Sequence, residues 1–322
     1  MEEIKQKNIL ICGATGFIGR NLLEYFHSKN IYKIRAIHFN RPALMHYEGV
    51  EWVNADLRNP ESVKNVLADI DIVLQFAATT SGAKDILSRP FIHVTDNAVM
   101  NSLLLRECYE QSIKHFVFPS CTVMYQPSET ALDETSFDAN KQLLPSYFGV
   151  GNTKLYIEKM CEFFSRQNRT KHTVIRHSNI YGPYDKYDLE RSHMFGASIT
   201  KVMKAVEDGE ITVWGAGEEK RDLLHVYDLL TFVESAIQNQ KNSYELFTVG
   251  IGKGEKVIDI INKIIKYSGK KIKVKHDLSM PTIPTSVFLN CNKAKKELGW
   301  EPLINLDNGI INTIDWYNKN VK

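Results

Sequence analysis

The chain has 322 residues, which is long enough for one large domain or for two unequal ones. Charged residues make up 24% of it and the formal net charge is +2, so no broad basic field predicts a nucleic acid or a membrane surface as a partner. No apolar stretch approaches the roughly 20 residues that cross a bilayer. The five cysteines are scattered without ligand spacing, which predicts reduced thiols, no metal site and a cytoplasmic protein.

The chain opens with a glycine-rich turn between an apolar run and an amphipathic segment. Residues 8–12 predict a buried strand, glycines follow at 13, 16 and 19, and residues 20–26 continue as a helix. The free N–H groups and the dipole at the start of such a helix bind phosphate, and glycine permits the tight turn and the close approach. The GxxGxxG spacing therefore predicts a dinucleotide site. The expected cofactor contacts in this turn are Gly13, Thr15, Gly16, Phe17, Ile18 and Gly19.

Apolar runs alternate with helical patterns over the first two-thirds of the chain. Such alternation predicts βαβ units on a parallel sheet. Asn59 followed by Pro60 predicts the capped start of a helix. The runs that predict further strands are 33–38, 50–56, 71–78, 115–120 and 173–178, and helices are expected over about 97–113 and around Lys154 to about residue 166.

After about residue 180 the pattern becomes looser and the predicted elements become shorter. A strand is expected at 211–214, and helices at 228–238, at 257–267 and near the C-terminus. We predict an α/β fold, with a Rossmann-type doubly wound parallel sheet and a smaller mixed α/β C-terminal lobe. The dinucleotide domain is expected over 1–180, with segments at about 210–240 returning to it. The substrate lobe is expected over 181–322, with the substrate between the two parts.

Eight short motifs follow one another along the chain. They are the GxxGxxG turn, Asp56-Leu-Arg58, Phe76-Ala-Ala78, Pro119-Ser-Cys-Thr122, Lys154, Asn179-Ile-Tyr-Gly-Pro183, Arg221-Asp-Leu-Leu-His-Val-Tyr-Asp228 and Lys296-Glu-Leu-Gly-Trp300. In these motifs nearly the whole chain resembles the extended short-chain dehydrogenases/reductases of the nucleotide-sugar epimerase, dehydratase and reductase group. Residues 181–193 are most similar to GDP-fucose synthases, in which a histidine at the position of His193 protonates a carbon next to a keto group. The resemblance implies an NAD(P)-dependent epimerase or reductase, a GDP-linked sugar as substrate and a homodimer.

The central catalytic position departs from this family. The resemblance implies a tyrosine acid/base four residues before a lysine, on the same face of a helix. Val150 stands four residues before Lys154, and valine cannot carry a proton. The usual Ser/Thr position falls on Cys121, and the position of the synthase's cysteine falls on Val123. Of the expected catalytic groups, Lys154 and His193 remain in place.

Three interpretations of this departure stay open. Tyr147 lies seven residues before Lys154, and it would share a helical face with the lysine if the helix begins early. Cys121 or Thr122 could instead carry the proton, with Lys154 holding the nicotinamide ribose. The chain could also be a catalytically silent binding homologue. Because residues 121–123 contain no carboxylate, a 4,6-dehydratase is not expected.

Other residues resemble family members that bind substrate or cofactor. Arg221 resembles the arginine that grips the substrate diphosphate, for which a planar guanidinium is suited, and Asn179 resembles a substrate-binding asparagine. After the second strand no acid is present to bind a ribose 2′-OH, whereas Arg41 could pair with a 2′-phosphate, so NADP is favoured over NAD. The remaining expected cofactor contacts are Asn40, Arg41, Asp56, Leu57, Ala77, Ala78 and Lys154.

Overall fold

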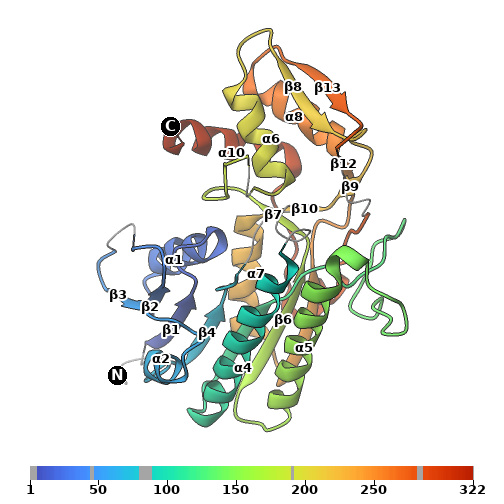
Figure 1. The fold of residues 1–322 in the computed structure, drawn as a ribbon. Helices are drawn as coiled ribbons and strands as arrows, with labels where there is room; N and C mark the ends of the chain where they lie inside the picture. Colours follow the sequence, from blue (N-terminus) through green and yellow to red (C-terminus); the bar gives the residue numbers. More distant parts are fainter. Residues whose placement is uncertain (1–5, 44–46, 80–88, 190–191, 281–285, 322) are drawn as a thin grey trace.

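The computed structural model describes residues 6–43, 47–79, 89–189, 192–280 and 286–321. Within these ranges seven strands form one sheet, and a smaller lobe lies beyond one end of it (Figure 1). In spatial order the strands are β11 (Tyr244–Val249), β6 (Lys171–His177), β5 (His115–Pro119), β4 (Ile72–Gln75), β1 (Lys7–Cys12), β2 (Tyr32–His38) and β3 (Val50–Asn54). All neighbouring pairs are parallel, which confirms the predicted doubly wound sheet.

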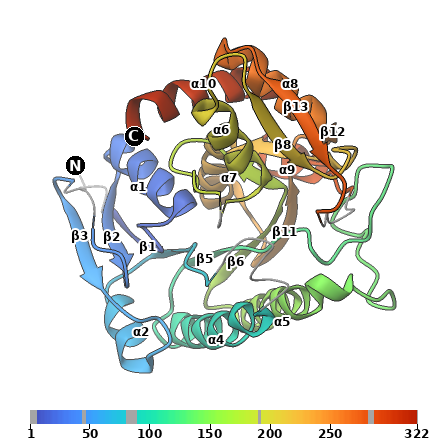
Figure 2. The same cartoon turned by 45° about the horizontal axis from the view of Figure 1, so that its top comes forward.

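Helices cover both faces of this sheet (Figure 2). The side chains of β1 show the reason, because residues 9–12 are all fully buried and alternate ones point to opposite faces. Ile9 and Ile11 pack in one hydrophobic cluster, whereas Leu10 and Cys12 pack in the other. The first face is covered by α1 (Phe17–Lys29), α7 (Val226–Asn239) and α9 (Asn292–Leu298), and the second by α2 (Pro60–Val66), α4 (Thr95–Glu110) and α5 (Phe148–Ser165).

The start of α2 follows the predicted cap. The Asn59 side-chain oxygen accepts hydrogen bonds from the backbone N–H groups of Glu61 and Ser62, at 2.9 and 3.1 Å. Pro60 occupies the first turn, where its missing N–H costs no helical hydrogen bond. Helix α2 therefore begins where the sequence predicts it.

The C-terminal half contributes to both parts of the molecule. The segment that returns to the sheet is 226–249, since α7 packs on the sheet and β11, a strand that the sequence pattern leaves unassigned, pairs with β6. In contrast, β8 (Glu210–Trp214) pairs with β13 (Lys273–Asp277) in the smaller lobe. The remaining elements are η1 (Pro90–His93), η2 (Pro145–Tyr147), β7 (Asn179–Tyr181), α6 (Met194–Lys204), β9 (Lys220–Arg221), β10 (Leu223–His225), β12 (Glu255–Lys256), α8 (Val257–Ser268) and α10 (Leu306–Asn320).

Candidate active site

The carboxyl ends of four strands bring together residues from distant parts of the chain. In a parallel sheet these ends lie at one edge, and open α/β sheets bind ligands there, at the point where the strand order reverses. Here the order reverses between β1 and β4. Gly13 follows β1, Ala77 follows β4, Cys121 follows β5, and His177 ends β6. The predicted cofactor turn and the predicted catalytic residues therefore share one edge.

The glycine turn has the shape that a dinucleotide diphosphate requires. Gly13 has a φ of 75°, and a Cβ there would lie 2.8 Å from the Ala77 backbone. A Cβ on Gly19 would lie 2.0 Å from the Gly13 carbonyl oxygen, so α1 begins in direct contact with the turn. Gly16 caps α1 without a side-chain hydrogen bond, which leaves the first N–H groups of the helix to a ligand. These residues fit a nicotinamide dinucleotide.

The residues predicted to contact the rest of the cofactor differ in how exposed their side chains are. Both carboxylate oxygens of Asp56 accept hydrogen bonds from the Arg58 guanidinium, each at 2.9 Å. Asn40, Arg41 and Ala78 are exposed. The side chain of Leu57 is instead buried in the core. Any contact of Leu57 with a cofactor would therefore be made by its backbone.

Lys154 lies on α5 and reaches the end of β5. Its Nζ donates a hydrogen bond to the Pro119 carbonyl at 2.7 Å and lies 4.6 Å from the centre of the Phe118 ring. Burial lowers the pKa of Lys154, while Cys121 and Glu158 act in the opposite direction. Burial likewise raises the pKa of the Cys121 thiol, against the charge of Lys154. The lysine and the thiol are therefore close neighbours, and the thiol keeps its proton at neutral pH.

Tyr147 reaches the same region from η2, the short turn that leads into α5. Burial raises the pKa of its phenol, which Arg221 lowers and Cys121 raises further. Tyr147 thus lies near both the predicted proton-carrying thiol and the predicted diphosphate-binding arginine. Thr122 is half-buried beside Cys121, and its carbonyl accepts a hydrogen bond from the Tyr125 N–H at 3.0 Å.

Arg221 and Asn179 are both anchored next to Asp222. The Arg221 Nη1 donates to the Lys220 carbonyl at 2.9 Å, and the Asn179 side chain donates to the Asp222 carbonyl at 3.1 Å. The Asp222 carboxylate accepts hydrogen bonds from the backbone N–H groups of residues 251, 252 and 289, at 2.9 to 3.1 Å. Asp222 therefore joins the loops around the site.

His193 immediately precedes α6, at the edge of the smaller lobe. Its imidazole retains contact with solvent. The surrounding protein still removes part of its hydration, and together with the charge of Lys186 this lowers its pKa. A neutral imidazole at physiological pH can accept a proton.

His177 is a member of the site that sequence reasoning missed. It is half-buried at the end of β6, and its Nδ1 lies 2.8 Å from the Ser178 carbonyl oxygen. Burial lowers its pKa to about 4, with smaller contributions in the same direction from Lys154 and His193, so His177 lies near both predicted catalytic groups. The available signal was its place at the end of a predicted strand, directly before the Ser-Asn-Ile-Tyr-Gly-Pro segment.

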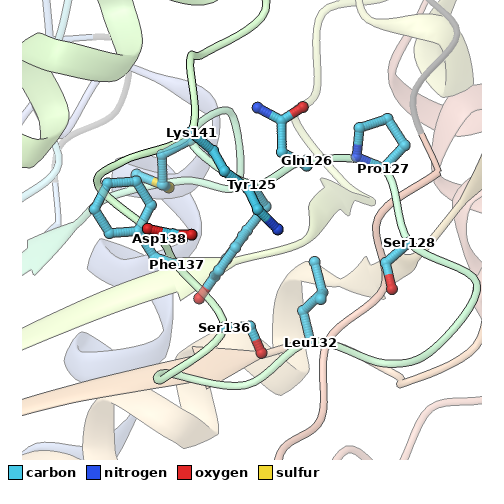
Figure 3. A pocket seen from close by; sticks show the side chains of 10 residues that line it. Tyr125, Gln126, Pro127, Ser128, Leu132, Ser136, Phe137, Asp138 and Lys141 are labelled. Atoms are coloured by element: carbon cyan, nitrogen blue, oxygen red, sulfur yellow. The ribbon is translucent and has the colours of Figure 1, made fainter.

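A buried ion pair joins β6 and α5 next to the site. The Arg176 guanidinium contacts the Glu158 carboxylate at 2.7 Å and donates to the Tyr125 hydroxyl at 3.0 Å. Tyr125 also lines a pocket of about 150 Å³ formed mainly by the loop after β5 (Figure 3). None of the predicted catalytic residues is among those that line this pocket in the described part of the chain.

A metal site and a membrane-spanning helix are both absent from the described ranges. No group of His, Cys, Asp and Glu side chains there is arranged to hold a metal ion. None of the helices in those ranges combines the length and the apolar character that a bilayer crossing requires.

The sheet, its glycine turn and the ionisable groups beside it define an enzyme with a nicotinamide dinucleotide site. The NAD dependent epimerase/dehydratase family matches residues 9–250, and the chain belongs to this family. This match confirms the resemblance drawn from the motifs.

Several relatives match nearly the whole chain. It is 25% identical to GDP-L-colitose synthase of Yersinia pseudotuberculosis, over 96% of this chain and 97% of that protein. It is 26% identical to GDP-L-fucose synthase of Azorhizobium caulinodans, over 97% of both chains. The structure of UDP-glucose 4-epimerase from Bifidobacterium longum in complex with NAD+ and UDP matches with a TM-score of 0.81 at 20% identity, over 98% of this chain and 99% of that chain. The chain is thus an enzyme of the NAD-dependent nucleotide-sugar epimerase and reductase type.

Proposed function

We propose that this enzyme modifies a GDP-linked sugar by epimerisation next to a keto carbon, by hydride transfer at C4, or by both. The observation that carries the proposal is the gathering of proton-carrying side chains around Lys154, at the sheet edge that also holds the glycine turn. The GDP-specific names of two full-length relatives support the choice of nucleotide.

Each side chain has a role that its surroundings support. A bound nicotinamide supplies or accepts the hydride, and Lys154 would hold its ribose. His193 would exchange a proton with a carbon next to the keto group. Arg221 and Asn179 would bind the diphosphate and the sugar. Tyr147, Cys121 or Thr122 would exchange a proton with the reacting oxygen, in place of the tyrosine that Val150 replaces. Burial keeps the phenol and the thiol protonated.

Three further properties belong to the same proposal. NADP is favoured as the cofactor because residues 38–41 contain no acid and include Arg41. A homodimer is favoured because exposed apolar side chains lie on α4 and α5, two helices that run side by side on the outside of the molecule (Figures 1 and 2). A cytoplasmic location agrees with five free thiols.

The main test uses GDP-4-keto-6-deoxy-D-mannose in deuterated water. We expect deuterium to enter the sugar next to the keto carbon and, when NADPH is added, the cofactor to be oxidised. Nuclear magnetic resonance and absorbance at the NADPH band measure the two events. The absence of both, with binding retained in calorimetry against GDP, UDP and dTDP sugars, would identify the silent homologue instead.

Two substitutions separate the candidate proton donors. Cys121→Ala removes the thiol and Tyr147→Phe removes the phenolic hydroxyl, and both variants keep Lys154. The variant that lacks the true donor should lose about 10²- to 10⁴-fold in NADPH-dependent turnover while cofactor affinity is retained. If each variant alone keeps wild-type turnover, neither side chain is the required donor.

A further inference from the structure

His177 lies where a catalytic side chain of this site is expected. It is the last residue of β6, at the edge that carries the glycine turn, and Lys154 on α5 and His193 before α6 both affect its pKa. The neighbouring strand β5 ends at Pro119, whose carbonyl holds the Lys154 ammonium at 2.7 Å. Two imidazoles and one ammonium group therefore converge on this edge.

The hydrogen bond of His177 determines which ring nitrogen is available. Its Nδ1 lies 2.8 Å from the Ser178 carbonyl oxygen, and a carbonyl can only accept. Nδ1 therefore carries the proton in the neutral ring, and the lone pair lies on Nε2. Within the described ranges, no group forms a hydrogen bond with Nε2. The backbone carbonyl therefore fixes the tautomer in which Nε2 is the atom that can accept a proton.

The other groups of the site are less suited to accept a proton at neutral pH. Burial raises the pKa values of the Cys121 thiol and the Tyr147 phenol, so both stay protonated. The Lys154 ammonium already donates to Pro119. The carboxylate of Asp222 is already engaged by three backbone N–H groups, which leaves the imidazoles of His177 and His193 as the candidate proton acceptors among the described site residues.

We propose that His177 is a catalytic base that removes the proton from a sugar carbon next to the keto carbon, in partnership with His193. This inference rests on the proposed function and assigns to it a residue outside the family pattern. The C–H bond breaks, an N–H bond forms at Nε2, and the electron pair moves to the keto oxygen to give an enolate. Return of the proton restores the keto sugar. For inversion, the exposed His193 ring first takes a proton from solvent and then delivers it to the other face of the carbon, and His177 afterwards releases its proton to solvent. No oxidant or reductant is consumed.

His177→Asn tests the role of Nε2 directly. The asparagine amide can still donate near the position of Nδ1, but it has no basic nitrogen. His177→Gln is the second variant, in case the first disturbs the strand. His276→Asn is the matched control, because the Nδ1 of His276 also lies 3.0 Å from a backbone carbonyl, that of Gly215, on an exposed strand of the smaller lobe.

The measurement is deuterium uptake into GDP-4-keto-6-deoxy-D-mannose without added cofactor, with the UDP- and dTDP-linked 4-keto-6-deoxyglucose compared alongside. We expect both His177 variants to slow exchange by about 100-fold or more, as expected for loss of a general base, while calorimetric affinity for the sugar nucleotide stays unchanged. His276→Asn should exchange at the wild-type rate. Exchange by both His177 variants at the wild-type rate would overturn the assignment.

Nuclear magnetic resonance of ¹⁵N-labelled imidazoles in the ligand-free protein provides a readout that is independent of turnover. We expect His177 to be neutral at pH 7, with its proton on Nδ1. A charged ring, or a proton on Nε2, would contradict the proposal. If the wild-type protein binds a sugar nucleotide but exchanges no proton, the base assignment fails and hydride transfer at C4 remains. If it binds no sugar nucleotide, the proposed function itself fails.

Discussion

Gly19 is the residue with the least room in the first turn, because its Cα faces the carbonyl of Gly13. A Cβ at this position would lie 2.0 Å from that oxygen. We expect Gly19→Ala to push α1 away from the turn, to lower the free energy of unfolding by about 1–3 kcal/mol and to weaken NADPH binding by about tenfold or more. Thermal unfolding and isothermal titration calorimetry measure the two effects.

Gly16→Ala is the control within the same turn. Gly16 has a φ of −85°, which any residue can adopt, and its Cβ would lie 3.2 Å from the same oxygen. We expect only a small change in NADPH affinity. Wild-type affinity in Gly19→Ala would show that this turn does not hold the cofactor.

Arg41 tests the choice of cofactor at the scale of one side chain. It is exposed after β2, and its carbonyl lies 3.1 Å from the His38 Nδ1. If its guanidinium pairs with the 2′-phosphate, Arg41→Ala should weaken NADPH binding by about tenfold and leave NADH binding unchanged. Lys33→Ala, at the opposite end of β2, removes the same charge as a control. Equal affinities of Arg41→Ala and wild type for NADPH would argue against an NADP site at Arg41.

At the scale of elements, strand β6 combines core packing with ionisable side chains. Arg176 forms the buried ion pair with Glu158, and His177 enters the site one residue later. His172 is fully buried earlier on the same strand, and both of its ring nitrogens lack a partner in the described structure. The strand therefore carries polar groups whose protonation affects stability as well as chemistry.

Burial lowers the pKa of His172 to about 4, so the folded protein keeps this ring neutral. The unfolded chain binds a proton there near pH 6.5, hence the free energy of unfolding falls as the pH drops from about 6.5 towards 4 and is unaffected by this group above 6.5. We expect His172→Leu to reduce the stability loss between pH 7 and 5 by about 2 kcal/mol. Urea unfolding at several pH values measures this loss of stability in the wild type and in the variant.

The exposed His276 serves as the control for this prediction. His276→Leu lies on β13, outside the main sheet, and should leave the pH dependence of unfolding as it is in the wild type. An unchanged pH profile in His172→Leu would mean that this ring takes up its proton at the same pH in the folded and in the unfolded protein, which would contradict the prediction.

At the scale of the whole molecule, α4 and α5 form an outer surface with unburied apolar side chains. Val99, Tyr156 and Phe163 are 40%, 42% and 51% exposed, and the Ser102 and Tyr156 hydroxyls, 3.0 Å apart, join the two helices. If a second copy covers this surface, Phe163→Asp should convert a dimer into the 36.9 kDa monomer, because a buried charge would be unpaired. Light scattering after gel filtration measures the mass.

Leu303→Asp is the control for the dimer prediction. Leu303 is 75% exposed just before α10, away from α4 and α5, so its substitution should leave the mass unchanged. A wild-type protein that is monomeric at all concentrations would contradict the prediction.

The amino-acid sequence by itself determined the buried strands, the glycine turn and the start of α2, because each depends on side-chain periodicity or on turn chemistry within a few residues. It also determined that Val150 cannot transfer a proton. Only the tertiary structure decided that β11 rather than β8 joins the sheet, since strand pairing depends on which distant segments pack together. It also brought Tyr147 near Arg221, and His177 near Lys154 and His193. The order of the strands and the packing of α5 determine which side chains lie together at the sheet edge. A local sequence pattern does not specify that order.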